Sequence, residues 1–227
     1  MNIIDYKTFF VGKDKILHTN LISQKTFTQE QFSLAVNEIY RHKNFLYDSI
    51  EDLKLDTLGC IAVSLDKTIS LTLKELTLYA NSIMLNHYCS ENNISSPYYL
   101  GTDWFFYQHY SCTRSFWHNH QKFQVPYTEK LTGELKGITV PSTLTYVIYL
   151  QVPDTSNHNG NLLFTTDRTK RGEVLVEDPS DIKFSPTKGD MLIFPGNVLH
   201  CVEPHTDSTA RFVLAGNMYI KNPKVAI

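Results

Sequence analysis

The sequence is poor in the features that mark several large protein classes. Four cysteines are spread over 227 residues with no C-x-x-C pair, which excludes a zinc ribbon, a thioredoxin-like motif and a disulfide scaffold. Ten glycines and nine prolines exclude collagen-like and low-complexity chains. No apolar run approaches the ~20 residues that cross a bilayer, and the first 15 residues lack an apolar signal core. We therefore expect a cytoplasmic protein with no membrane partner.

Charge of either sign is also not in excess. Lys and Arg number 21 and Asp and Glu number 23, for a net charge of -2, which excludes a generally basic nucleic-acid binder. What the chain has instead is 42% hydrophobic and 12% aromatic residues, enough for a real core. No linker or internal repeat is visible, so we expect residues 1–227 to form a single domain.

The N-terminal part, residues 1–96, shows helical patterns and is expected to be a mainly helical layer. Thr28 and Gln31 have the spacing of a capping box, and apolar residues follow at helical intervals. Thr72 and Glu75 repeat the pattern before a second apolar stripe, which ends near Asn93. Residues 59–65 between the two helices are expected to form a short strand.

From residue 97 to 220 the pattern changes to short β-prone runs separated by glycine and proline. Such spacing is typical of a β-sandwich or barrel. The sequence therefore predicts an α+β protein, with N-terminal helices packed on a β-core. The expected strands lie at residues 104–110, 144–150, 161–165, 172–176, 190–194 and 211–220.

Three of the nine histidines form a candidate metal site. His118 and His120 close an aromatic strand, and residues two apart in a strand point to the same face. His200 follows another strand and turn. Three imidazoles suit a borderline divalent metal such as Fe(II), Mn(II) or Zn(II).

The surroundings of His200 resemble a known superfamily. Residues 188–195 (KGDMLIFP), then 200–204 (HCVEP), then Arg211 are similar to the C-terminal signature of Fe(II)/2-oxoglutarate-dependent oxygenases, in their prolyl-hydroxylase-like and phage-associated branch. Residues 144–150 and 159–164 resemble that branch's tyrosine-leucine strand and the turn and strand after it. The resemblance covers residues 97–220. It implies a double-stranded β-helix, of jelly-roll or cupin-like type, that uses Fe(II), 2-oxoglutarate and dioxygen.

The resemblance also implies roles for individual residues. His118 and His200 fall on the family's two histidine ligands, and His120 falls where the family has a carboxylate ligand. The metal-ligating and catalytic set would therefore be His118, His120 and His200. Arg211, eleven positions after His200, would bind the far carboxylate of 2-oxoglutarate through its planar guanidinium, and Tyr149 would supply a helper hydroxyl.

The implied activity is hydroxylation of an unactivated C–H bond in a small-molecule or peptidyl substrate. Residues 121–143, longer than the usual connection in this branch, are expected to form an extra hairpin or lid beside the metal. The alternative is that this insertion is a solvent-exposed segment without a functional role.

Two other functions fit the same residues. The first is a cupin-type three-histidine metal-dependent oxygenase that does not use 2-oxoglutarate. Gly189, Pro195 and His200 match a cupin motif, although Asn197 replaces its glycine and Gln124 stands where a glutamate is expected. The second is a non-catalytic β-helix binding module. Arg211 is needed only by the 2-oxoglutarate reading.

Overall fold

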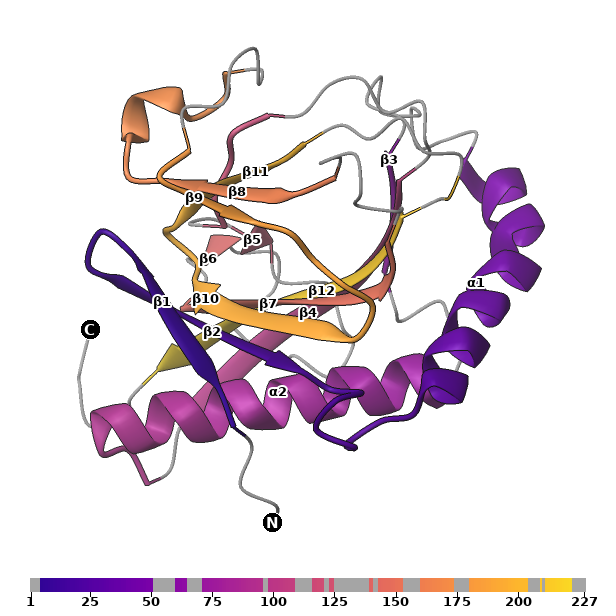
Figure 1. The fold of residues 1–227 in the computed structure, drawn as a ribbon, viewed down its shortest axis with the longest axis horizontal. Helices are drawn as coiled ribbons and strands as arrows, with labels where there is room; N and C mark the ends of the chain where they lie inside the picture. The colour runs from indigo at the N-terminus through magenta and orange to yellow at the C-terminus, as the bar shows by residue number, and fades with distance from the viewer. Residues whose placement is uncertain are drawn as a thin grey trace.

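A computed structural model describes residues 5–50, 60–64, 71–95, 98–108, 116–120, 123–124, 139–140, 143–152, 160–173, 180–203, 209 and 211–221. Two long helices and two facing antiparallel sheets make up most of this part of the chain (Figure 1).

Helix α1 spans Gln29–Ile50 and begins at the predicted capping box. The Thr28 backbone N–H donates to Gln31 Oε1 at 2.8 Å, and the Gln31 N–H donates to Thr28 Oγ1 at 3.1 Å. These reciprocal bonds satisfy two of the donors that every helix leaves unpaired at its N-terminus. This part of the sequence prediction is confirmed.

Helix α2 spans Leu71–Asn92, and its start differs from the prediction. Thr72 lies inside the helix, one residue after its first, so it is not the N-cap that the sequence pattern indicated. The C-terminal end is as predicted, because Asn93 adopts the left-handed conformation with φ of 53°. Asparagine tolerates this conformation better than most residues, which lets it terminate the helix.

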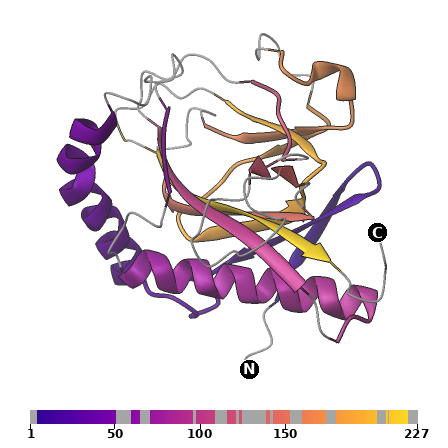
Figure 2. The ribbon, with the colours of Figure 1, turned by 180° about the vertical axis from the view of Figure 1, so that it is seen from behind.

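The larger sheet has seven strands in the order β1-β2-β10-β7-β12-β4-β3, and each neighbouring pair is antiparallel. Both helices lie on the same face of this sheet, as the front and back views show (Figures 1 and 2). The strands are β1 (Lys7–Val11), β2 (Asp14–Asn20), β3 (Cys60–Ser64), β4 (Tyr98–Gln108), β7 (Leu144–Gln151), β10 (Asp190–Pro195) and β12 (Arg211–Lys221).

The β1–β2 hairpin was not expected, because the first 96 residues were predicted to be mainly helical. Its turn holds Gly12 at φ of +60°, where a Cβ would lie 2.9 Å from Thr166 Cγ2. Glycine is therefore favoured there by both backbone conformation and space. The hairpin extends the larger sheet through pairing of β2 with β10. Strand β3 in the same region is confirmed.

The smaller sheet faces the larger one and has the order β11-β8-β9. Its strands are β8 (Leu162–Thr165), β9 (Ile182–Phe184) and β11 (Leu199–Val202). A separate antiparallel pair joins β5 (Phe123–Gln124) to β6 (Thr139–Val140), so a hairpin pairing exists within the 121–143 insertion. The expected strand over 172–176 has Gly172 in a turn, and its last three residues lie outside the described part.

Alternating side chains of the larger sheet divide the core into two layers. On β7, Tyr146 and Ile148 pack with residues of α1 and α2, whereas Val147 and Tyr149 pack with Leu162 and other residues of the smaller sheet. This alternation follows from the period of two residues in a strand. The second layer, between the two sheets, is called the inter-sheet core below.

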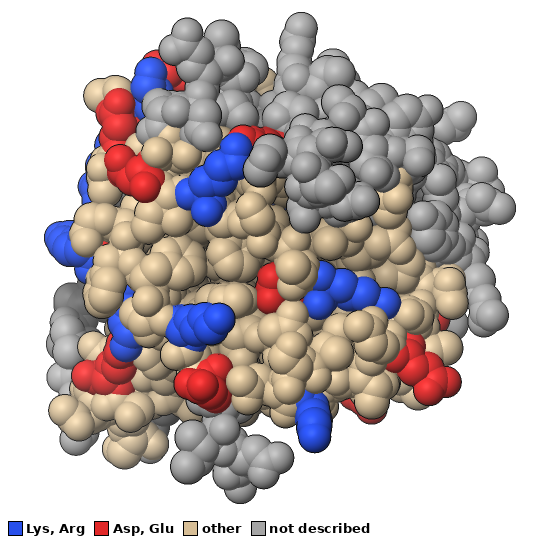
Figure 3. Space-filling view, in the orientation of Figure 1, with Lys and Arg blue, Asp and Glu red and all other residues tan. Residues whose placement is uncertain are grey.

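The surface charge and the helices also bear on possible partners. On the face in Figure 3, cationic and anionic side chains are interspersed among uncharged ones, and neither sign forms a broad patch. Among the residues that the structure describes, neither helix combines the length and apolar character required to span a membrane.

Candidate metal centre

Backbone pairing brings the three histidines together. Residues 116–120 run beside β11, and His118 and His200 exchange both of their backbone hydrogen bonds, each at 2.9 Å. The His120 N–H donates to the Gly196 carbonyl at 2.8 Å. A pair of directly opposite strand residues projects its side chains to the same face. The H-x-H spacing then places His120 on that face as well.

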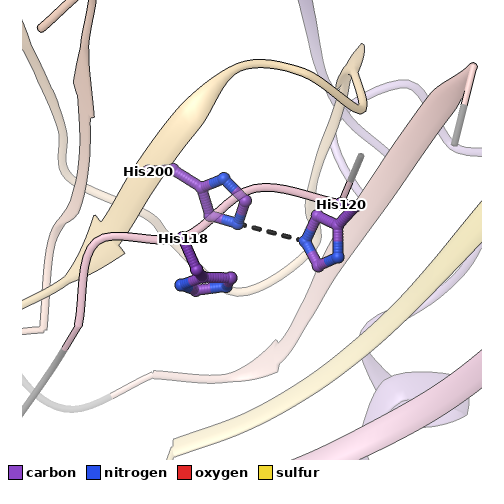
Figure 4. A group of neighbouring side chains, drawn as sticks. All are labelled: His118, His120 and His200. Atoms are coloured by element: carbon purple, nitrogen blue, oxygen red, sulfur yellow. Dashed lines mark hydrogen bonds between the residues drawn. The ribbon is translucent and has the colours of Figure 1, made fainter. Parts of the chain in front are cut away.

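The imidazoles converge on one small volume (Figure 4). One ligand nitrogen from each ring lies within 4.8 Å of the others, and the Nε2 atoms of His120 and His200 are 3.2 Å apart. Metal–nitrogen bonds of about 2.0–2.1 Å at tetrahedral or octahedral angles place two ligand nitrogens roughly 2.9–3.4 Å apart. The observed separation fits two ligands of one ion.

Hydrogen bonds fix which ring nitrogen of two of these histidines is available. His118 Nδ1 lies 3.0 Å from the Phe116 carbonyl oxygen, and His200 Nδ1 lies 3.0 Å from the Val198 carbonyl oxygen. Because a carbonyl only accepts, each Nδ1 carries the hydrogen and donates it. The lone pair of each neutral ring then resides on Nε2. Hydrogen bonds from the nitrogen that does not bind the metal orient histidine ligands in metal sites.

The protein environment keeps these rings neutral. Desolvation lowers the pKa of His118, with the Phe116 carbonyl opposing the shift. Desolvation and the neighbouring His118 lower the pKa of His120 to about 3. Desolvation, then His118 and His120, lower the pKa of the buried His200 well below its usual value. Neutral imidazoles can offer a lone pair to a cation, so the three rings form a candidate donor set.

Arg211 and Tyr149 form a second polar group in the fold. Arg211 is only 3% exposed and begins β12, and its guanidinium carbon lies 5.1 Å from the centroid of the Tyr149 ring. Nη1 donates to the Gly160 carbonyl at 3.1 Å and Nη2 to Tyr149 Oη at 3.5 Å. Burial raises the pKa of Tyr149 to about 12, so the phenol keeps its proton and remains a donor.

The guanidinium of Arg211 is incompletely satisfied. Its Nε has no hydrogen-bond partner, and no carboxylate in the described part of the chain forms an ion pair with Arg211. Buried cations are normally paired because an unpaired charge in the interior costs several kcal/mol. An orphaned donor on a buried cation is the arrangement expected of an anion-binding residue.

Both groups border the inter-sheet core. The His200 ring lies 5.0 Å from the Phe194 ring and 6.3 Å from the Phe164 ring, centroid to centroid. Tyr149 packs in the cluster that contains these two phenylalanines. The metal-type donor set and the anion-type group therefore sit on opposite sides of one core.

Sequence reasoning missed the groups that support these side chains. Gly160 supplies a carbonyl to Arg211, and Asn161 beside it donates to Glu203, which also pairs with Lys183. The Phe116 and Val198 carbonyls were missed as well. Backbone acceptors carry no residue-type signal, although Gly160, with φ of 76°, marks a turn that the sequence does show.

Comparison with known families identifies the class. The family model for the 2OG-Fe(II) oxygenase superfamily matches residues 105–219, about half of the chain. The chain belongs to this superfamily, whose members are enzymes that use Fe(II) and take 2-oxoglutarate as cosubstrate. No curated protein sequence matches.

Solved structures confirm the double-stranded β-helix. A viral collagen prolyl hydroxylase from Paramecium bursaria Chlorella virus-1, in complex with 2OG, has a TM-score of 0.53 at 9% identity, covering 89% of this chain and 94% of that one. A Trichoplax adhaerens prolyl hydroxylase in complex with a hypoxia inducible factor peptide has a TM-score of 0.55 at 13% identity, and the match covers 92% of this chain and 84% of that one. The epimerase SnoN from nogalamycin biosynthesis has a TM-score of 0.56 at 12% identity, and the match covers 91% of this chain and 78% of that one.

Proposed function

We propose that this protein is a hydroxylase in which His118, His120 and His200 bind the iron. Arg211 and Tyr149 bind the far carboxylate of 2-oxoglutarate. The observation that carries this proposal is the buried guanidinium of Arg211, which pairs with no described carboxylate, across the same core from the three converging imidazoles. A metal site alone would fit several oxygenase types, whereas the pair of sites fits a metal with a dicarboxylate cosubstrate.

The proposed reaction converts a substrate C–H bond, dioxygen and 2-oxoglutarate into C–OH, succinate and carbon dioxide. Bound iron and 2-oxoglutarate supply the oxidant from dioxygen. The protein's own residues hold the ion at three fixed nitrogens and orient the cosubstrate. Arg211 contributes its charge and its free Nε–H, and Tyr149 contributes the phenol O–H that burial keeps protonated.

We propose a peptidyl or small-molecule substrate. The structural neighbours support both classes, since one is a complex with a hypoxia inducible factor peptide fragment and another is a complex of SnoN with nogalamycin RO. We also propose that the 121–143 segment forms an extra hairpin or lid beside the metal, and the pairing of β5 with β6 supports the hairpin. One domain over residues 1–227 is supported by the entry of β1, β2 and β3 into the larger sheet. A cytoplasmic location stays a prediction.

The test is anaerobic addition of Fe(II) and then 2-oxoglutarate, followed by visible absorption. We expect a charge-transfer band that requires both components. His200→Ala should lose the band and stoichiometric iron binding, because two protein ligands are too few. His87→Ala is the matched control, since that histidine lies on α2 and pairs with Glu91.

The outcomes separate the alternatives. Iron binding that is lost in His200→Ala but unaffected by 2-oxoglutarate would favour the cupin-type oxygenase. Absence of iron binding in the unaltered protein would refute the proposal and leave the non-catalytic binding module.

A further inference from the structure

The candidate metal centre has no negative charge of its own. The group that lies close enough to share an ion consists of three histidines and, among the described residues, no carboxylate. Two described carboxylates near the core have other partners. Asp190 accepts from His18, Asn20 and Thr187, and Glu203 accepts from Asn161 and Lys183. A divalent ion held by neutral imidazoles keeps its full charge of two.

Arg211 adds a further positive charge on the other side of the inter-sheet core. It is buried, and no described carboxylate pairs with it. With the metal bound, this region would hold three positive charges and, among the described residues, no compensating anion. Like charges in a partly desolvated interior repel strongly, and the repulsion falls when an anion enters between them.

We propose that the neutral donor His120 makes metal binding and dicarboxylate binding depend on each other more strongly than a carboxylate at that position would. This inference rests on the proposed function and deepens it. A dianion neutralises the metal's charge and supplies the partner that Arg211 lacks. By linkage, the factor by which the dianion tightens metal binding equals the factor by which the metal tightens dianion binding.

A carboxylate at position 120 is expected to weaken this dependence. His120→Asp lowers the charge of the donor set by one, so it should tighten metal binding without 2-oxoglutarate. The gain on adding 2-oxoglutarate should then shrink, on the order of tenfold, which is within the usual range of coupling between two sites.

The experiment measures the dissociation constant of Co(II) with and without saturating 2-oxoglutarate, under anaerobic conditions and at constant ionic strength. Co(II) absorption in the visible reports coordination, so no turnover is needed. The three proteins are the unaltered chain, His120→Asp and Asn119→Asp. The last adds the same charge one residue away, where strand alternation directs the side chain to the other face.

We expect 2-oxoglutarate to tighten Co(II) binding at least tenfold in the unaltered protein. The same factor is expected in Asn119→Asp, and a factor about tenfold smaller in His120→Asp. Equal factors in all three proteins, with metal and 2-oxoglutarate both bound, would overturn this inference and leave the proposed function intact. If His120→Asp fails to fold, His120→Glu makes the same comparison, and an unchanged factor in that variant overturns the inference. No Co(II) binding under either condition would instead refute the proposed function.

Discussion

Replacement of Arg211 by alanine should separate ligand binding from folding. The guanidinium is buried, makes two hydrogen bonds, and has an Nε–H without a partner and no described anionic partner. Its removal relieves the desolvation cost of that charge. It also deprives the Gly160 carbonyl of a donor, which costs about 1–2 kcal/mol. These effects oppose each other, so the free energy of unfolding should change by no more than about 1–2 kcal/mol.

The effect on 2-oxoglutarate binding should be much larger. Loss of a buried, charge-assisted guanidinium–carboxylate contact costs about 2–4 kcal/mol. At 1.4 kcal/mol for each factor of ten, the dissociation constant should rise about 30- to 1,000-fold. Fe(II) binding should persist, because no metal ligand changes. Arg211→Lys should be intermediate, since lysine keeps the charge but loses the planar fork.

Two measurements test this prediction. Anaerobic titration of the Fe(II) protein with 2-oxoglutarate gives the affinity, and urea unfolding of the ligand-free protein gives the stability. Arg168→Ala removes an exposed arginine and is the control for a general loss of charge. The reasoning is refuted if Arg211→Ala binds 2-oxoglutarate like the unaltered protein while it loses several kcal/mol of stability. Arg211 would then be a structural residue.

Three further predictions concern stability. Because the folded pKa of His120 is lowered to about 3 from 6.5, the unfolded chain binds more protons in acid. Stability of the metal-free protein should therefore fall as the pH drops through this window. In urea unfolding, His120→Ala should reduce the slope of the free energy of unfolding against pH by up to about 1.4 kcal/mol per pH unit. An unchanged slope would contradict this prediction. Burial alone would raise the pKa of Asp190, but hydrogen bonds from His18, the Thr187 amide and Asn20 outweigh it and lower that pKa. At neutral pH, Asp190→Asn should lower the free energy of unfolding by about 2–4 kcal/mol. The control Asp5→Asn, at an exposed residue, should change it little. Equal urea midpoints for the two variants would disprove this prediction. Asn93→Ala should cost about 1 kcal/mol because alanine disfavours the left-handed conformation, whereas Asn93→Gly should be neutral; equal losses would argue against a cap at that position.

The sequence was most informative where a short spacing determines geometry. The H-x-H pair requires only strand alternation to bring His118 and His120 to one face. The capping box of Thr28 and Gln31 likewise needs only local hydrogen bonds. Tyr149 precedes His200 by 51 residues and Arg211 follows it by 11, and no local spacing rule connects the three, so only the resemblance to a family suggested that they act together.

Features that depend on tertiary pairing were harder to predict. The β1–β2 hairpin exists in its observed place because β2 pairs with β10, about 170 residues later in the chain. Thr72 matches a capping box by residue type, but the helix starts one residue earlier. Helix boundaries are set by the whole terminus rather than by one motif. The carbonyls that orient His118 and His200 belong to the backbone, and every residue offers one.

In the proposed function, the division of the site between two sheets gives the core a role beyond stability. His200 stands on β11 of the smaller sheet, whereas Arg211 and Tyr149 stand on β12 and β7 of the larger one. Facing sheets pack roughly 10 Å apart, at a distance determined by the side chains between them. Phe164 and Phe194 are among these side chains, and both lie against the His200 ring. The packing between the sheets therefore determines the separation between the imidazoles and the guanidinium. In the proposed function a dicarboxylate spans that separation, so we expect core residues that touch no ligand to influence which dicarboxylate fits.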